Sequence, residues 1–258
     1  MPGLMLESYI DRVHDTQTLT RYGRIVDIVG LTIEATGPSM AVGDLCYVQP
    51  KDSSQKLAVE VVGFRGDRIL LMPLDSIDGV GPGSLLFPTF APTTVRVGPD
   101  LLGRVVNCMG DPLDGGPLPR GVGRAPLMAV PPKPMERRRI TEPISTGIRA
   151  IDSCVTCGRG QRVGIMSGSG VGKSKLLGMI TRNTNADIIV IGLVGERGRE
   201  VRDFIEVDLG PEGLKRAVVV VATSDEPALR RVKGAYMATA VAEWFRSQGA
   251  DVMLLMDS

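Results

Sequence analysis

One glycine-rich segment constrains this chain more than any other part of its sequence. It consists of Ser167, Gly168, Ser169, Gly170, Val171, Gly172, Lys173 and Ser174. The preceding residues 162–166 predict a short buried strand, and residues 175–181 predict a helix. Glycines between a strand and a helix let backbone N–H groups converge on one point, where the positive end of the helix adds to their field. Residues 167–174 therefore predict a phosphate-binding loop.

The last two residues of this loop indicate its ligand. In the pattern known as Walker A, the lysine (here Lys173) reaches the β- and γ-phosphates of a nucleotide, and the hydroxyl (here Ser174) holds Mg²⁺. The strict pattern begins with glycine, whereas this chain has Ser167. An ordinary turn is the alternative, but Gly-Lys-Ser rarely arises by chance between a strand and a helix. We therefore predict ATP and Mg²⁺ as ligands.

Composition excludes several other classes of protein. The 30 Lys and Arg residues and 29 Asp and Glu residues nearly cancel, so net charge gives no argument for nucleic acid or membrane binding. Four cysteines suit a reduced cytosolic protein, and we interpret the pair Cys154 and Cys157 as structural because no second pair or nearby histidine accompanies it. The sequence shows neither a long apolar run nor a signal peptide, which favours a cytoplasmic location.

Two regions precede the part of the chain that contains the phosphate loop. Residues 1–20 form a tail in which residues 4–16 predict a weak amphipathic helix; a frayed terminus and a docking helix for a partner are both compatible with it. Residues 21–95 contain short β-rich runs separated by glycine and proline, typical of a small barrel or sandwich. The runs are residues 24–29, 31–35, 45–48, 57–64 and 68–72. We expect this domain to serve packing and assembly.

Residues 96–145 predict a connection into the nucleotide-binding core. Seven prolines between residues 117 and 145 stiffen it and disfavour a helix or a central strand. Lys133 and the run Arg137-Arg138-Arg139 lie in this connection. A contact with phosphate or with an acidic neighbour is one interpretation of these charges. We favour the other interpretation, a solvated surface.

Residues 146–258 predict a parallel sheet with a site at one edge. Apolar runs at 187–194, 217–222 and 251–257 alternate with helical segments, a pattern typical of right-handed crossovers. Ligands of such sheets bind beyond the carboxyl ends of the strands, where Glu196 follows the first run. A carboxylate there can orient or deprotonate the water that attacks a γ-phosphate. The alternative is that Glu196 and Arg197 only cap the helix expected at 199–207.

The final run ends in a second acidic residue. Asp257 is placed by its strand where a carboxylate can stand beside a nucleotide's Mg²⁺ shell, the arrangement known as Walker B. A strand that ends in aspartate is common by itself. Because a Gly-Lys-Ser loop precedes it in this chain, we predict that Ser174 and Asp257 together hold the metal ion.

Several motifs together resemble the flagellar and virulence type III secretion ATPases, which are related to the catalytic subunits of rotary ATP synthases. The motifs are residues 146–152 (Thr-Gly-Ile-Arg-Ala-Ile-Asp), 157–162 (Cys-Gly-Arg-Gly-Gln-Arg), 168–174, 195–200 (Gly-Glu-Arg-Gly-Arg-Glu) and 255–258 (Leu-Met-Asp-Ser). The resemblance extends over almost everything after residue 20. It implies an α/β RecA-like P-loop NTPase core with a mostly parallel sheet, preceded by a small N-terminal β-barrel.

The resemblance also implies roles for individual residues. Lys173 and Ser174 match the residues that contact phosphate and Mg²⁺, and Asp257 matches the metal-associated acid. Glu196 matches the catalytic glutamate, with Arg197 as its catalytic neighbour. A glutamate at position 196 is similar to catalytic rather than regulatory subunits. The loop and the Met-Asp-Ser ending look more flagellar than virulence-type.

The implied protein is an export ATPase. It forms a homo-hexameric ring with ATP at the subunit interfaces, in the cytoplasm and peripheral to an inner-membrane export gate. Its implied partners are a stator-like regulator at the N-terminus, export substrates and their chaperones, but no nucleic acid. Members of this family continue past the second nucleotide motif, so we expect the chain to be a fragment, truncated after Walker B and poorly active alone.

Two other functions are compatible with the motifs. The first is a RecA-like nucleic-acid translocase, which needs exposed aromatic residues and a basic groove in the barrel. Residues 21–95 contain few aromatic candidates. The second is a noncatalytic ring subunit, whose turnover would not depend on Glu196.

Overall fold

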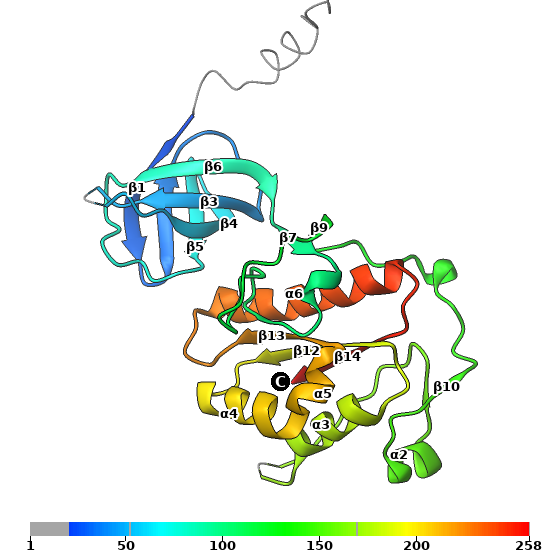
Figure 1. Ribbon diagram of the computed structural model, residues 1–258. Coiled ribbons are helices and arrows are strands. Elements are labelled where there is room, and N and C mark those ends of the chain that lie inside the picture. Colours follow the sequence, from blue (N-terminus) through cyan, green and yellow to red (C-terminus); the bar gives the residue numbers. More distant parts are fainter. Residues whose placement is uncertain (1–20, 52, 169, 258) are drawn as a thin grey trace, which may run out of the picture. The chain divides into compact units, whose positions relative to one another are not determined.

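The computed structural model describes residues 21–51, 53–168 and 170–257 (Figure 1). The helix expected within residues 4–16 and loop residue Ser169 lie outside these residues. The chain divides into two compact units, Met1–Pro92 and Thr93–Ser258.

The first unit contains a closed antiparallel barrel, with strand order β1-β2-β5-β4-β3-β6 (Figure 1). Alternate residues of a strand point inward, so a barrel of this size is filled by side chains. In β5, for example, Ile69 and Leu71 are buried and pack with Ile33, Val48 and Leu86. The strands are β1 (Gly23–Val29), β2 (Thr32–Thr36), β3 (Asp44–Gln49), β4 (Leu57–Arg65), β5 (Arg68–Pro73) and β6 (Leu85–Pro92).

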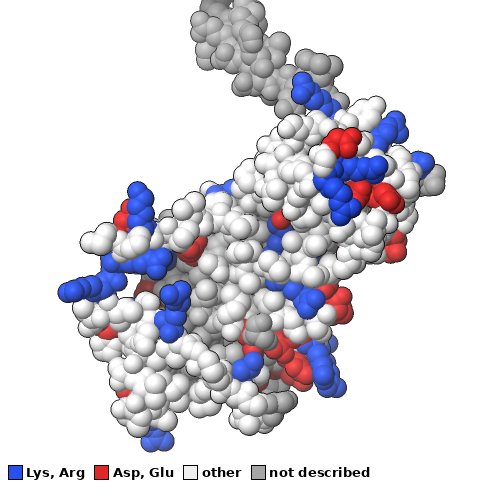
Figure 2. All heavy atoms as spheres, turned by 180° about the vertical axis from the view of Figure 1, so that it is seen from behind, with Lys and Arg blue, Asp and Glu red and all other residues white. Residues whose placement is uncertain are grey.

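Basic and acidic side chains stand side by side on the surface of this barrel (Figure 2). Glu34 of β2 is almost buried, and it pairs with Arg65 at 3.0 Å and Arg68 at 3.4 Å. The two arginines flank the turn between β4 and β5. A carboxylate removed from water in this way needs such cationic partners. These ion pairs therefore connect β2 to the β4–β5 turn at one end of the barrel.

The second unit is built on a parallel sheet with strand order β14-β12-β13-β8. Its strands are β8 (Val105–Val106), β12 (Ile188–Val194), β13 (Ala217–Ala222) and β14 (Val252–Asp257). Two small antiparallel pairs accompany it: β7 (Thr94–Val97) with β9 (Gly123–Pro126), and β10 (Pro143–Ile144) with β11 (Cys157–Gly158). The helices are α2 (Arg149–Cys154), α3 (Lys173–Asn183), α4 (Gly198–Asp203), α5 (Gly210–Lys215) and α6 (Ala228–Ser247), with a π-helical segment η3 (Phe204–Leu209) and 3₁₀ turns η1 (Pro99–Leu101) and η2 (Pro134–Glu136). None of the helices in the described residues is apolar over enough length to cross a bilayer.

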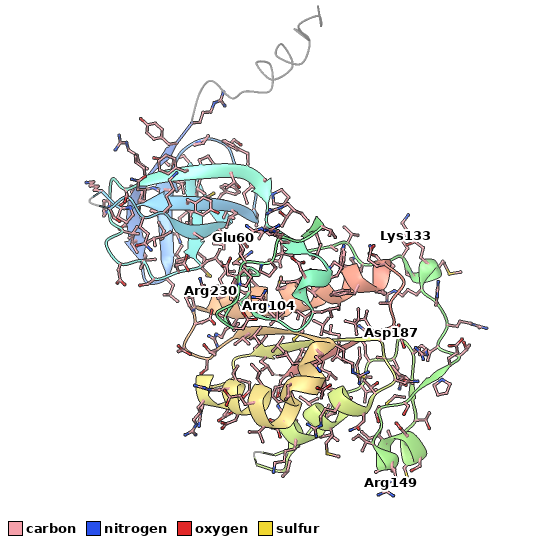
Figure 3. The ribbon with its side chains drawn as sticks, in the orientation of Figure 1. Glu60, Arg104, Lys133, Arg149, Asp187 and Arg230 are labelled. Atoms are coloured by element: carbon pink, nitrogen blue, oxygen red, sulfur yellow. The ribbon has the colours of Figure 1, made fainter. Side chains whose placement is uncertain are left out.

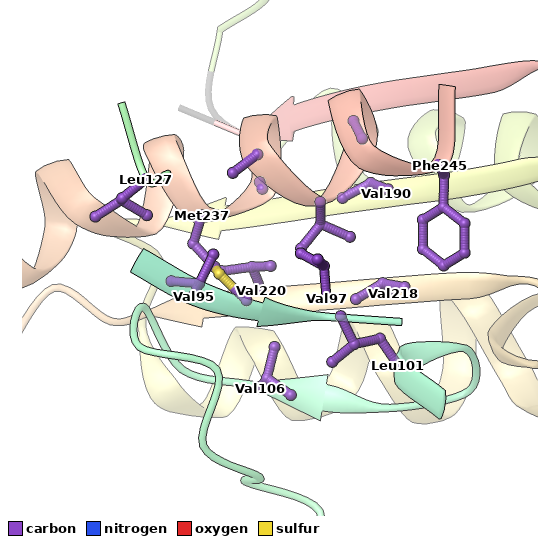
Figure 4. Packing of buried hydrophobic residues seen from close by; sticks show 14 residues of the cluster. Val95, Val97, Leu101, Val106, Leu127, Val190, Val218, Val220, Met237 and Phe245 are labelled. Atoms are coloured by element: carbon purple, nitrogen blue, oxygen red, sulfur yellow. The ribbon is translucent and has the colours of Figure 1, made fainter. Parts of the chain in front are cut away.

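Both faces of the sheet are covered, which explains its continuous apolar strands. Val190, Val218 and Val220 face α6 and pack against Met237 and Phe245 (Figure 4). The intervening residues of the same strands face the other way and pack with residues of α3, α4 and η3. That second cluster includes Ile189, Ile191, Val219, Leu177, Val201 and Phe204. Because successive side chains of a strand alternate between faces, strands covered on both sides lose the polar half of their pattern.

The strand predicted at residues 162–166 is wrong. These residues adopt no regular structure and pair with none of the strands of the described sheet. Val163 is 51% exposed and Met166 is 95% exposed. A strand requires a neighbour that takes its backbone hydrogen bonds, and none lies beside residues 162–166 in the described part of the chain. The apolar run before the phosphate loop is therefore an exposed, irregular segment.

An ion pair fixes the start of the connection into the core. Arg104, labelled in Figure 3, donates from Nε and Nη2 to the two carboxylate oxygens of Asp114 at 2.7 and 2.8 Å. The guanidinium holds the pKa of Asp114 well below its usual range, helped by backbone N–H donors. The bidentate geometry makes this pair rigid. Farther along, residues 128–142 are exposed throughout, including Lys133 and the three arginines at 137–139.

Replacing Gly178 by alanine is expected to destabilise the second unit, although alanine is the better helix former by about 1 kcal/mol. Gly178 is buried in α3, and a Cβ there would lie 2.6 Å from the carbonyl oxygen of Asp208 in η3. We expect a net loss of about 1–3 kcal/mol in the free energy of unfolding, measured by denaturant titration. Met179→Ala, at the exposed neighbouring position, is the control. An unchanged or higher midpoint for Gly178→Ala contradicts this packing.

Candidate active site

The phosphate loop curls through two left-handed glycines. Gly170 and Gly172 have φ angles of 76° and 99°, a region that other residues rarely adopt. Gly172 is the N-cap of α3, and its carbonyl accepts the backbone N–H of Leu176 at 2.9 Å. Ser167, Gly168, Gly170 and Val171 are exposed. The loop therefore presents its backbone, and the free N–H groups of the first turn of α3, to solvent where an anion can bind.

Lys173 and Asp257 meet across the carboxyl edge of the sheet. The Lys173 Nζ lies 2.5 Å from Oδ1 of Asp257, which ends β14 and is only 3% exposed. The Asp257 carboxylate, followed by the more distant charge of Glu196, raises the pKa of Lys173 against a smaller opposing effect of burial. Lys173 is therefore a fixed cation at the start of α3. The predicted lysine and the predicted metal-associated acid thus lie together.

Glu196 is held at the same edge by backbone contacts. Gly195, with φ 80°, turns the chain immediately after β12, and its N–H donates to the carbonyl of Ala222 at 2.7 Å. The carbonyl of Glu196 accepts the N–H of Ser224 at 2.9 Å. These bonds fasten the residue after β12 to the end of β13. Glu196 is half-buried, and its negative charge contributes to the raised pKa of Lys173.

Arg197 lies on the outer side of this site. It is the N-cap of α4, its side chain is 67% exposed, and its Nη1 is 3.8 Å from Oε1 of Glu200. Its ion pair therefore runs along α4 toward solvent. A part for Arg197 in catalysis stays a prediction.

The donor groups at this site suit Mg²⁺ with a nucleotide. Ser174 is exposed in the first turn of α3, next to the Lys173–Asp257 pair. Hydroxyl and carboxylate oxygens are the hard ligands that Mg²⁺ prefers, and it usually binds one or two of them together with phosphates and water. In the described residues, no three His, Cys, Asp or Glu side chains gather to hold a metal without such help. Ser174 and Asp257 would hold the ion, which supplies charge neutralisation to the phosphates.

A supporting cluster around Asp152 was not predicted as part of the site. Asp152 in α2 accepts hydrogen bonds from Ser145 Oγ, Thr146 N and Oγ1, and Gly147 N at 2.7–3.1 Å. Thr184, just after α3, donates to the carbonyl of Ser145 at 2.8 Å. The cluster therefore anchors the far end of the helix that begins with Lys173. The Thr-Gly-x-x-x-x-Asp spacing of residues 146–152 was its only sequence signal.

These hydrogen bonds make the stability of the chain depend on pH. The Thr146 hydroxyl first, then the other donors, lowers the pKa of Asp152 to about 2, against about 3.9 in an unfolded chain. A depressed carboxyl pKa contributes stability above about pH 4, and that stability is lost as pH falls toward 2. We expect Asp152→Asn to be less stable than the parent at pH 6, with a gap that closes below pH 4. Unfolding titrations across pH measure it, and a gap of equal size at pH 3 and pH 6 contradicts the assignment.

Two family models match the chain. Residues 147–258 match the nucleotide-binding domain of the ATP synthase alpha/beta family, and residues 25–89 match its beta-barrel domain. The chain belongs to this family. The predicted family and the predicted architecture, a β-barrel followed by an α/β RecA-like P-loop core, are therefore confirmed.

Relatives within the ATP synthase alpha/beta family include secretion ATPases. The chain is 52% identical to the flagellum-specific ATP synthase of Bacillus subtilis, over 98% of this chain and 58% of the relative. It is 44% identical to the type 3 secretion system ATPase of Xanthomonas euvesicatoria, over 98% of this chain and 58% of the relative. A solved structure of the assembled ATPase EscN with its central stalk EscO, from enteropathogenic E. coli, matches with a TM-score of 0.83 at 43% identity, covering 92% of this chain and 57% of that one. The chain thus spans less than two thirds of the length of these relatives.

Proposed function

We propose that this chain is the nucleotide-binding part of an ATPase that drives protein export by a flagellar or virulence type III secretion apparatus. The observation that carries the proposal is the Lys173–Asp257 ion pair between the phosphate loop and the end of β14. It places a cation and a buried carboxylate at one point, close enough to Glu196 for that carboxylate to raise the pKa of Lys173. The names of the relatives supply the physiological process.

The geometry supports a defined sequence of events. On binding of Mg–ATP, the Lys173 ammonium leaves Asp257 and contacts the β- and γ-phosphates. The freed carboxylate of Asp257 and the Ser174 hydroxyl would then hold Mg²⁺, which would neutralise phosphate charge. Backbone N–H groups of Gly168 and of residues 170–174 hold the phosphates at the N-terminus of α3. The positive groups of the site thus face the phosphates, and its oxygen ligands face the metal ion.

Glu196 completes the proposed reaction. Its carboxylate orients a water molecule in line with the γ-phosphate and accepts a proton as the water oxygen bonds to phosphorus, while the bond from phosphorus to the bridging oxygen breaks and ADP leaves. Lys173 stabilises the negative charge that spreads over the transferred phosphoryl group. Glu196 extends from backbone bonded to the end of β13, and Lys173 extends from the first turn of α3, so little reorganisation is needed at the moment of reaction. The product phosphate leaves by the exposed side of the loop.

The assembly is part of the proposal. We propose a homo-hexameric ring with nucleotide at the subunit interfaces, cytoplasmic and peripheral to the export apparatus. A stator-like regulator at the N-terminus, export substrates and chaperones are the proposed partners. Support comes from the solved relative, which is described as an assembled ATPase bound to a central stalk. The Mg²⁺ dependence and the flagellar rather than virulence setting also belong to the proposal.

Turnover measured against protein concentration tests this function. We expect ATP hydrolysis that requires Mg²⁺ and rises per subunit as concentration increases, because interface sites form only on assembly. Mass photometry on the same samples reports the oligomeric state. Equal turnover per subunit in samples that contain only monomer contradicts the ring mechanism, and hydrolysis without a divalent cation contradicts the metal assignment.

A further inference from the structure

Two of the four cysteines differ from the others in their surroundings. Cys46 lies in the barrel core and Cys108 is buried in the second unit, whereas Cys154 is exposed and Cys157 is partly exposed. All four are free thiols. Burial, chiefly, raises the pKa of the Cys46 thiol to about 11. Because only the thiolate is a nucleophile, Cys46 is unreactive. Among the described residues, Cys154 and Cys157 are the thiols that a reagent can reach.

The exposed pair is arranged across one short link. Cys154 is the last residue of α2 and Cys157 is the first residue of β11, with Val155 and Thr156 between them. The Val155 N–H still bonds the carbonyl of Ile151 at 2.9 Å, so the link stays against the end of the helix. The Cys157 thiol lies 3.5 Å from the carbonyl oxygen of Val155, the residue bonded to Cys154. The Cys157 thiol therefore lies against the two-residue link that joins it to Cys154.

This arrangement suits a disulfide better than packing or metal binding. A disulfide needs Cα atoms within about 7 Å, a range that cysteines separated by two residues reach in dithiol–disulfide motifs with this spacing. Packing does not explain the pair, since neither cysteine belongs to a buried apolar cluster of the described residues. Zinc needs four ligands, and the described residues offer no third His, Cys, Asp or Glu beside the pair.

We propose that Cys154 and Cys157 are a redox modification site, a dithiol that closes to an intrachain disulfide by exchange with a low-molecular-weight disulfide such as oxidised glutathione. The Cys154 thiolate attacks one sulfur of that disulfide, which forms a mixed disulfide and releases one small thiolate. The Cys157 thiolate then attacks Sγ of Cys154 and releases the second. Two electrons pass to the small disulfide, which takes up the two thiol protons, and a reducing dithiol reverses the reaction.

The pair lies in a segment that contacts both α3, which carries Lys173, and β14, which carries Asp257. Figure 3 shows α2, marked by Arg149 at its start, standing clear of the sheet. Beyond the pair, Arg159 forms an ion pair with Asp251, next to the start of β14. Before it, β10 pairs with β11 and continues to Ser145, which bonds the residues after α3. The disulfide would therefore form between two points where this segment is bonded to its neighbours: the residues that follow α3, the helix of Lys173, and the start of β14, the strand of Asp257.

Mass spectrometry of the whole chain tests the modification site without nucleotide, so the result is independent of the proposed ATPase function. The chain is incubated with oxidised glutathione, quenched in acid and labelled with N-ethylmaleimide after unfolding. We expect label on Cys46 and Cys108 only, a loss of two hydrogens, and a peptide in which Cys154 and Cys157 are linked. Dithiothreitol added before labelling should restore label at both positions.

Single substitutions separate the two steps of the exchange. Cys157→Ser is expected to stop at the glutathione mixed disulfide on Cys154, and Cys154→Ser is expected to react more slowly because Cys157 is less exposed. Cys46 and Cys108 serve as internal controls for unfolding during oxidation. Four labelled cysteines after oxidation, a glutathione adduct that persists on the parent chain, or a disulfide between two chains would each overturn the proposal.

Discussion

Lys173→Ala is expected to lower the affinity for Mg–ATP by at least about a hundredfold. Charge-assisted hydrogen bonds contribute roughly 1.5–3 kcal/mol each, and Lys173 is predicted to make them to two phosphates. Every 1.4 kcal/mol corresponds to about tenfold in affinity. Titration with a fluorescent ATP analogue in excess Mg²⁺ measures the change directly. ATP turnover in the assembled protein should fall at least as far.

The same substitution should weaken the fold, and this effect has to be separated from binding. Removal of the ammonium leaves the buried carboxylate of Asp257 without its cation, which we expect to cost about 1–3 kcal/mol in the free energy of unfolding. The double variant Lys173→Ala/Asp257→Asn should recover stability but not nucleotide affinity. Lys175→Ala, at an exposed position of the same helix, is the matched control and should change neither. Affinity within about threefold of the parent for folded Lys173→Ala would remove Lys173 from the site.

The sheet of the second unit could be predicted because its environment is simple. Strands β12 and β13 are apolar along their whole length, since α6 covers one face and α3 with its neighbours covers the other. A strand that is buried on both faces is a continuous apolar run, so its burial can be predicted from its composition. The carboxyl end of β12 locates Glu196, and the end of the apolar run that forms β14 locates Asp257, without knowledge of the tertiary structure. These parts of the site follow from local pattern.

Two other segments show where local pattern fails. Strand β6 was missed because it contains prolines, which disfavour a strand. Pro88 is tolerated because β6 pairs with β1 only at Leu85 and Leu86, so beyond them only the β3 side of β6 is bonded. Residues 162–166 have the composition of a strand but pair with no strand of the described residues, so they form no regular structure and are exposed. Pairing is a property of the neighbours, and a single segment does not encode it.

The contacts within the site were also beyond the sequence. Its pattern predicted Lys173 as a phosphate ligand and Asp257 as a metal-associated acid, but not their direct ion pair. Nor did it predict that Ser224, from the next strand end, fixes the backbone of Glu196. Such contacts depend on how far two distant segments lie apart after folding. Residue types and strand ends predict which residues belong to a site, but the contacts between those residues are known only from the folded structure.

Glu196→Gln is expected to separate nucleotide binding from hydrolysis. Glutamine keeps the shape of the side chain but cannot accept a proton, and general-base catalysis contributes typically about 10²–10⁴-fold. We expect ATP turnover to fall by about that factor. Mg–ATP affinity should stay within about threefold of the parent or become tighter, because a negative charge near the phosphates is removed. Steady-state turnover and equilibrium titration on the same samples give the two values.

The neighbouring acid provides the control for this experiment. Glu200 lies on α4, is exposed, and pairs at 3.8 Å with Arg197 on the solvent side of the site. Since Glu200→Gln removes the same charge from nearly the same stretch of chain, a general electrostatic effect would lower turnover in both variants. Position-specific catalysis predicts a loss only at Glu196, whose backbone is fixed at the sheet edge. Unchanged turnover in Glu196→Gln would instead identify the chain as a noncatalytic subunit of its ring, which binds Mg–ATP through Lys173 and leaves hydrolysis to other subunits.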